Sequence, residues 1–202
     1  IGNNDQIWAE GGGTSHGVSI GVSSRGDCAP VIEGNQLIVG GLEDTSDNCR
    51  GVFCGQGNLS GLPSACEVVG NVEIRGSSFG FPFSSIGVLC EAGSCASVRD
   101  NQLITGRGGA NTVGIHLLGA GQTLVDSNRV EGGCTASSAV GLLAEDSSAR
   151  VQNNAIGGGS CQAGTTSNSG FYVGVQIMLG ADVNELDLHS NALSGGGTPQ
   201  SS

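Results

Sequence analysis

Two groups of side chains in this sequence have the residue types that acid–base chemistry requires. Asp126 and Arg99 occupy equivalent positions in successive copies of a repeated motif and could act as an acid and a base. His116 is a second candidate base, with Glu91 and Glu145 expected within one repeat of it. Exposed opposite charges are common on protein surfaces and contribute only about 0–1 kcal/mol. We therefore interpret these residues as a solvated ladder of mixed charge and an exposed histidine, with a catalytic role as the alternative.

Calcium is the one cofactor that the acids could hold. Asp100 is expected to lie beside Asp126 on the neighbouring repeat, where the two carboxylates could share a calcium ion. Calcium takes about six to eight oxygen ligands, and two acids supply too few of them. The Gly-Gly-x-Gly-x-Asp calcium repeat is also absent from the sequence. We therefore expect no cofactor and no metal, and keep calcium at these two acids as an alternative.

The composition argues against several classes of partner. The chain has 202 residues, a net charge of -11 and no lysine. Phosphate binding needs clustered Lys and Arg, so neither nucleic acid nor an anionic membrane surface is an expected partner. No apolar run approaches the roughly 18 residues that a membrane helix requires, so we expect no membrane insertion.

The candidate residues belong to a sequence repeat of two alternating motifs. The first is a glycine followed by apolar residues at alternating positions, and its copies begin at Gly17, Gly51, Gly87, Gly114, Gly141 and Gly174. Alternation with period two is the strand signal, and a repeat of about 20–50 residues is typical of a solenoid. We therefore predict an all-β fold, a right-handed parallel β-helix (β-solenoid) of about six turns. It would form a single domain over residues 1–202, which could be a segment of a longer solenoid.

The second motif places a polar residue at a recurring bend. Its copies centre on Asn35, Ser77, Asn101, Asn128, Asn154 and Asn191, with serine replacing asparagine once. Asparagine tolerates the left-handed backbone conformation better than other non-glycine residues. Its amide can also donate to and accept from a copy on the next coil. We therefore expect an internal ladder in which each of these side chains bonds the one above and below.

The five asparagines of this ladder make the sequence resemble the pectate-lyase-like superfamily of right-handed parallel β-helices over nearly the whole chain. The resemblance implies that an enzyme of this kind works on the outward face of one sheet, with clustered carboxylates, often calcium, and an Arg or Lys base. The row expected on that face holds no carboxylate and consists of Ser19, Phe53, Leu89, His116, Leu143 and Gln176. Its composition therefore argues against a sugar-cleaving enzyme, and the fold alone does not define a function.

Three apolar residues of that outward row suggest a different kind of surface. Phe53, Leu89 and Leu143 would form a stripe across several coils, and exposed apolar stripes mark interaction surfaces. The alternative is that residues 79–84, which contain three phenylalanines, or another loop covers the stripe. The sequence does not distinguish between the two.

Eight cysteines indicate disulfides and an oxidising compartment, so we expect a secreted or cell-surface protein. Cys134 and Cys161 occupy matching places on consecutive repeats and are a candidate pair. Cys54 and Cys90 also stack on consecutive repeats and form a second candidate pair. The local pairs Cys49–Cys54 and Cys90–Cys95 compete with the second pair, and the remaining connectivity stays open.

The leading functional hypothesis is a non-catalytic extracellular module with a structural or adhesive role, whose partners are other protein chains or solenoid turns. The first alternative is a polysaccharide lyase or glycoside hydrolase with polysaccharide as its substrate. The second is a carbohydrate-binding module that stacks sugars on Trp8 or Tyr172. No amphipathic capping helix is visible at either end, and an open coil end presents an unpaired strand edge that invites pairing.

Overall fold

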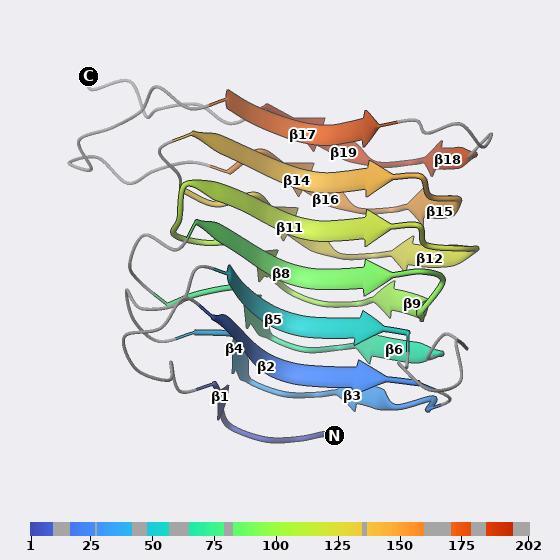
Figure 1. The fold of residues 1–202 in the computed structure, drawn as a ribbon. Coiled ribbons are helices and arrows are strands. Elements are labelled where there is room, and N and C mark those ends of the chain that lie inside the picture. The colour runs from blue at the N-terminus through green and yellow to red at the C-terminus, as the bar shows by residue number, and fades with distance from the viewer. Residues whose placement is uncertain are drawn as a thin grey trace.

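The computed structural model describes residues 1–9, 17–26, 28–41, 48–56, 65–78, 83–134, 137–159, 171–178 and 185–195. All regular structure in these ranges is β-strand, and the strands pair in parallel to form three sheets. Figure 1 shows the strands stacked in tiers from the N-terminus to the C-terminus. The strands that face the viewer run from left to right as the chain climbs, so the coil is right-handed. The parallel β-helix predicted from the sequence is therefore confirmed.

Each complete coil of the chain contributes one strand to each sheet, and the third sheet has one further strand at its N-terminal edge. The long sheet contains β2 (Val18–Arg25), β5 (Asn48–Gly55), β8 (Ser84–Glu91), β11 (Asn111–Leu118), β14 (Ser138–Glu145) and β17 (Phe171–Met178). The second sheet contains β3 (Val31–Glu33), β6 (Cys66–Val69), β9 (Cys95–Arg99), β12 (Thr123–Asp126), β15 (Ala149–Gln152) and β18 (Leu186–His189). The third sheet contains β1 (Ile7–Trp8), β4 (Leu37–Val39), β7 (Glu73–Arg75), β10 (Ile104–Thr105), β13 (Arg129–Glu131), β16 (Ala155–Gly157) and β19 (Ala192–Ser194).

Columns of aliphatic side chains fill the interior of the coil. Ile115, Val125 and Val130 come from the three strands of one coil, and all three are fully buried. Each stacks on an apolar residue of the next coil, as Ile115 does on Leu142. Because burying one aliphatic side chain stabilises a protein by about 1.5–3 kcal/mol, these columns supply the driving force for stacking.

A glycine in the middle of each long strand changes the direction in which the side chains face. In β11, Ile115 faces the central core, whereas Val113, two residues earlier, belongs to a separate cluster on the outer face. Strict alternation would put both on the same side, so the pattern breaks at Gly114. A Cβ atom on Gly114 would lie 2.6 Å from the carbonyl oxygen of Gly141 on the next strand. Close packing between coils therefore requires glycine in this column.

The first coil corrects the predicted register of the glycine motif. Gly21, not Gly17, falls in the glycine column, because Ile20 pairs with Arg50 and Val22 pairs with Val52. Val18, expected to face the core, is instead 53 % exposed. The sequence has a glycine followed by valine twice, at Gly17 and Gly21, and the second glycine is the one that is used.

The asparagine ladder runs through the whole solenoid at the turn between the second and third sheets. Each rung donates hydrogen bonds from both its backbone N–H and its Nδ2 atom to the Oδ1 atom of the rung on the next coil. For Asn128 bonded to Asn154 these distances are 2.8 Å and 3.0 Å. The bonds link Asn4, Asn35, Asn71, Asn101, Asn128, Asn154 and Asn191 in that order. This column satisfies polar groups that the turn would otherwise bury without partners.

The predicted ladder was wrong at one rung. Asn71 occupies the place assigned to Ser77, which follows β7 and donates instead to the carbonyl oxygen of Arg107. In the other copies of the second motif, the residue two positions after the asparagine is apolar, whereas this coil has Glu73 there. The buried Ile74 comes one position later, and it still pairs in register with Ile104.

The left-handed conformation belongs to the residue before each asparagine, not to the asparagine itself. Ser127 and Asn153, which precede two rungs, both have φ of 56°. Gly34 and Gly70 occupy the same place on earlier coils, each with φ of 62°. The expectation that the ladder asparagines themselves adopt this conformation is therefore corrected. Their role in the turn is to form hydrogen bonds.

Two disulfides join strands within single coils. Cys54 bonds Cys66, and Cys90 bonds Cys95, with Cα–Cα distances of 6.2 Å and 5.5 Å. The predicted pair Cys54–Cys90 is wrong although these residues are neighbours in register, because each bonds across the turn to the second sheet of its own coil. The alternative pair Cys90–Cys95 is confirmed, and Cys49–Cys54 is wrong because Cys49 is a free thiol.

The disulfides indicate that the protein folds in an oxidising compartment. Cys134 is also disulfide-bonded, but its predicted partner Cys161 lies outside the described residues. Among the residues placed by the structure, there is no helix long and apolar enough to span a membrane.

We predict that the two free thiols differ sharply in reactivity. Cys28 is exposed, whereas Cys49 is buried and its burial raises the pKa of the thiol to about 11. Because the thiolate is the reactive form, iodoacetamide at pH 8 should alkylate Cys28 of the native protein and leave Cys49 unmodified. Peptide mass spectrometry before and after unfolding without reductant measures both sites. Equal native labelling at the two cysteines would contradict the buried position of Cys49.

Candidate functional site on the outer face of the long sheet

The outer face of the long sheet carries a packed apolar cluster. Its buried members are Phe53, Ile86, Leu89, Val113 and Val140, and Ile20, Leu118, Leu143 and Val173 pack against them. The predicted stripe of Phe53, Leu89 and Leu143 lies within this cluster. Phe53 and Leu89 are only 3 % and 2 % exposed, so the expectation of an exposed stripe is wrong for these two residues.

The segment expected to cover the stripe lies largely outside the described residues. Of positions 79–84, the structure describes only Phe83 and Ser84. Phe83 is mostly exposed and does not belong to the outer cluster. Among the described residues, the side chains that pack on Phe53 include the two arginines described next.

Two arginines pack against the ring of Phe53. The guanidinium carbons of Arg25 and Arg50 each lie 4.9 Å from the ring centroid, within the range of a cation–π interaction. The Arg50 Nε atom is buried and has no hydrogen-bond partner in the described part of the chain. Burial lowers the pKa of Arg50, whereas the nearby charge of Glu91 raises it. This cation–aromatic group was not predicted, because the shifted register of the first coil hid the position of Arg25 beside Phe53.

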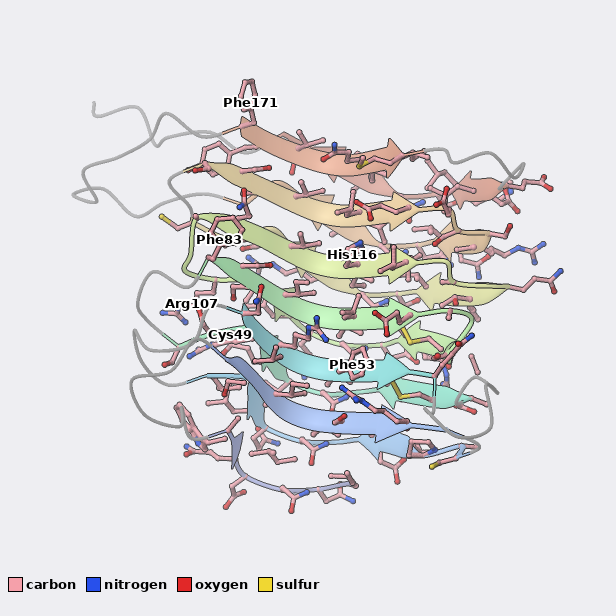
Figure 2. All side chains as sticks on the ribbon, in the orientation of Figure 1. Cys49, Phe53, Phe83, Arg107, His116 and Phe171 are labelled. Atoms are coloured by element: carbon pink, nitrogen blue, oxygen red, sulfur yellow. A yellow bond between two sulfur atoms is a disulfide. The ribbon has the colours of Figure 1, made fainter. Side chains whose placement is uncertain are left out.

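His116 lies in the middle of the outer face, two strands above Phe53 (Figure 2). Its neighbours in register are Leu89 and Leu143, and its side chain is 14 % exposed. The Nε2 atom lies 3.4 Å from Glu145 Oε2, but the two groups are not aligned as a hydrogen bond. Burial lowers the pKa of His116, and the negative charge of Glu145 partly opposes that effect. The predicted exposed histidine is therefore a mostly buried one.

The acids expected near His116 flank it from both sides. Glu91 and Glu145 pair in register with Leu118 from the strands below and above. The structure thus brings His116 and Glu145 together as the sequence suggested. These two carboxylates do lie on the outer face. They belong to the row of Leu118, which is the next outward row after the row of His116 considered in the sequence. An imidazole with a lowered pKa beside one carboxylate could accept a proton, but its neighbours in register, Leu89 and Leu143, offer no hydroxyl or thiol to activate.

Asp126 and Arg99 are neighbours in register but do not bond to each other. The Asp126 carboxylate accepts hydrogen bonds from Ser127, Gln152 and Asn153, each at 3.0 Å. The pKa of Asp126 is held below its usual value, mainly by the bond from Asn153. An acid with a lowered pKa is ionised at neutral pH and is therefore a poor proton donor.

Arg99 pairs with other acids. Its guanidinium lies 3.4 Å from Asp100 and 3.7 Å from Glu67, and all three side chains are substantially exposed. Asp100 thus contacts Arg99, while its backbone N–H donates to the carbonyl oxygen of Asp126. Across the described ranges, no group of three or more His, Cys, Asp or Glu side chains could hold a metal ion.

The two aromatic residues proposed as sugar platforms lie at opposite ends of the solenoid. Trp8 is in β1 and donates a hydrogen bond of 2.8 Å from its Nε1 atom to Gln6 Oε1. Tyr172 is half-buried in β17, on the last coil. They therefore do not combine into one binding surface.

The last described coil exposes side chains that are buried in the coil beneath it. Ile177, Leu188 and Leu193 are 46 %, 39 % and 53 % exposed. Their column neighbours on the preceding coil, Ala144, Val151 and Ile156, are buried. The apolar interior therefore continues to the end of the described solenoid without a cap from the described residues.

Comparisons of the chain with protein-family models, curated proteins and solved structures found no significant match. The class that the fold defines is a right-handed parallel β-solenoid with an internal asparagine ladder.

We predict that His116 makes the stability of the protein depend on pH. Its pKa is lower in the folded protein than in the unfolded chain, so the folded state binds the proton less well. Stability is then complete above the unfolded pKa of about 6.5 and decreases as the pH falls below it. His116→Gln should remove this decrease, as measured by urea unfolding between pH 7.5 and pH 5.

The matched control for this prediction is His189→Gln, because His189 is 64 % exposed. The difference in unfolding free energy between the wild type and His116→Gln should change with pH, and that for His189→Gln should change less. Parallel pH profiles for the wild type and His116→Gln would show that the imidazole is not buried as described.

Proposed function

We propose that this chain is a non-catalytic structural module of a secreted or cell-surface protein, similar in fold to pectate-lyase-like parallel β-helices. The observation that carries this proposal is the packing of the outer face of the long sheet. Phe53 and Leu89 are buried there, and His116 is mostly buried among leucines. A catalytic face of the kind that this fold family uses would present clustered, accessible carboxylates to a polymer, whereas Glu91 and Glu145 on this face are half-buried.

The chemistry of the titratable groups supports the same conclusion. Asp126 has a lowered pKa and bonds to neutral donors, so it is suited to remain ionised. Arg99 forms ion pairs with Glu67 and Asp100, so its guanidinium is held in its charged form and is not suited to act as a base. The disulfides Cys54–Cys66 and Cys90–Cys95 fix neighbouring strands to each other and suit a rigid extracellular spacer. Adhesion through such a spacer would use its ends or its variable loops.

The proposal is tested by incubating the purified protein with polyuronates and neutral polysaccharides. New reducing ends report hydrolysis, and ultraviolet absorbance reports the unsaturated products of a lyase. We expect neither signal above that of a heat-denatured sample. Cleavage that is lost in His116→Ala or Asp126→Ala but kept in the exposed control His189→Ala would overturn the structural role and favour the lyase or hydrolase alternative.

A further inference from the structure

We propose that the last described coil is a docking surface for another β-solenoid coil, which adds one parallel strand to each of the three sheets. The inference rests on the proposed structural function, since it names the partner of such a module. The surface consists of the free edges of β17, β18 and β19, which end the three sheets. Figure 1 shows these strands together at one end of the solenoid, and Figure 2 shows Phe171 projecting there from the start of β17.

The apolar character of this surface matches the interior of a coil. Ile177, Leu188 and Leu193 continue three core columns and remain 39–53 % exposed. On the preceding coil, the same columns are covered by the strands of the last coil itself. An occupant that buries these three side chains must therefore present aliphatic residues at the same spacing, as every coil of this chain does.

The asparagine ladder makes hydrogen bonding at this surface directional, because every rung donates to the rung that follows it. Along the chain, each rung donates from its N–H and Nδ2 atoms to Oδ1 of the following rung, as Asn154 does to Asn191 at 2.9 Å and 3.0 Å. Asn191 itself donates from Nδ2 to the carbonyl oxygen of Val151, and its N–H has no acceptor among the described residues. The end of the ladder therefore offers donors and requires an acceptor.

This direction selects the kind of partner. A coil that approaches with its N-terminal side presents the Oδ1 atom of its own ladder residue, which would accept from Asn191. A second copy that approached with its C-terminal coil would place donors against donors, so the ladder disfavours a two-fold dimer through this end. The partner is thus a coil stacked in the same direction, with Asn or another side-chain oxygen at its ladder turn.

The three free edges require an occupant with three strands. Each complete coil of the described chain has them, one in the long sheet and one in each of the other two sheets. The occupant is therefore a complete coil, with its own long strand beside β17.

The probe for this surface is a synthetic peptide of residues 137–159, which holds one complete coil with β14, β15, β16 and Asn154. Its N-terminus carries fluorescein, and the intact chain is titrated into it while fluorescence anisotropy is recorded. We expect saturable binding that is weakened at least tenfold by Leu193→Asp in the chain. The matched control is Val31→Asp, which changes an exposed valine at the opposite end and should leave binding unchanged.

The peptide carries a second test of the ladder direction. The Asn154→Leu peptide should bind at least tenfold more weakly, whereas the Asn153→Gly peptide should bind as the parent does. Circular dichroism establishes that the chain variants are folded before binding is measured. Absence of saturable binding at the highest chain concentration of the titration, or equal losses in Leu193→Asp and Val31→Asp, would overturn the inference.

Different experimental results would disprove the docking surface and the proposed structural function. Polysaccharide cleavage would overturn the structural role and leave the binding of the peptide unaffected. Failure of the peptide to bind would remove the docking surface without creating an enzymatic activity.

Discussion

Replacing Asn128 with alanine is expected to lower the free energy of unfolding by about 3–6 kcal/mol, since it leaves several buried polar groups unpaired at about 1–3 kcal/mol each. Asn128 Oδ1 accepts from the N–H and the Nδ2 of Asn101 at 3.1 Å and 2.8 Å. Its Nδ2 atom donates to the carbonyl oxygen of Val98 at 2.8 Å and to Asn154 at 3.0 Å. Alanine removes all of these bonds at once, in a turn where Asn101, Asn128 and Asn154 are buried.

Asn111→Ala is the matched control for this substitution. Asn111 is half-buried at the start of β11, and its side chain makes one long hydrogen bond of 3.4 Å to the carbonyl oxygen of Phe83. We expect a change of about 0.5 kcal/mol or less, as for most surface substitutions. Urea unfolding followed by circular dichroism measures both variants. Similar losses in the two would mean that the ladder contributes no more than an ordinary surface asparagine.

Replacing Gly114 with alanine is expected to destabilise the fold by about 3 kcal/mol or more, at the upper end of the usual cost of overpacking. The added Cβ would lie 2.6 Å from the Gly141 carbonyl oxygen and from Val130 Cγ1, and 2.8 Å from the Glu131 carbonyl oxygen. Two of these atoms belong to the backbone of neighbouring strands, so they cannot move aside as a flexible side chain would. Relief of the clash requires two coils to separate.

Gly121→Ala tests whether the effect comes from the clash or from the loss of glycine. A Cβ atom on Gly121 would meet only the Cα atom of Gly93, at an ordinary contact distance of 3.7 Å. Its unfolding free energy should change by about 0.5 kcal/mol or less. Thermal unfolding monitored by circular dichroism compares the two variants, and a Gly114→Ala protein as stable as Gly121→Ala would refute the close packing of the glycine column.

The repeated spacing of apolar residues was sufficient to predict the architecture. Alternation around Gly114 and Gly141 identified neighbouring strands of the long sheet in their correct register. The asparagines at 101, 128 and 154 identified the turn at which these coils stack. The apolar alternation and the recurring asparagine can both be recognised because stacking places the same positions of every repeat in the core. The sequence therefore shows each pattern many times.

The errors arose where one coil departs from that spacing. Asn71 was missed because Glu73 stands two positions after it, where every predicted copy of the motif has an apolar residue. The first glycine was misplaced because Gly17 and Gly21 both precede apolar residues, and only pairing with Gly51 and its neighbours distinguishes them. The disulfide Cys54–Cys66 was missed because it crosses a turn whose length cannot be read from a residue pattern.

The candidate site was harder to predict than the fold. Sequence spacing brought His116 close to Glu145, as the structure has it. It did not reveal that His116 is mostly buried or that Phe53 packs between Arg25 and Arg50. The burial of a side chain on an outer face depends on which long side chains pack over it. The residue pattern of a single sequence does not specify these contacts.

Hydrogen exchange of the asparagine side-chain amides, followed by NMR, tests the asparagine column most directly. The Nδ2 protons of Asn101, Asn128 and Asn154 are bonded inside the coil, so they should persist as long as the backbone amides of the core strands. Those of Asn111 and Asn153 are not in the buried column and should exchange much faster. Equally fast exchange from all five side chains would contradict the stacking of one rung upon the next, and with it the solenoid described above.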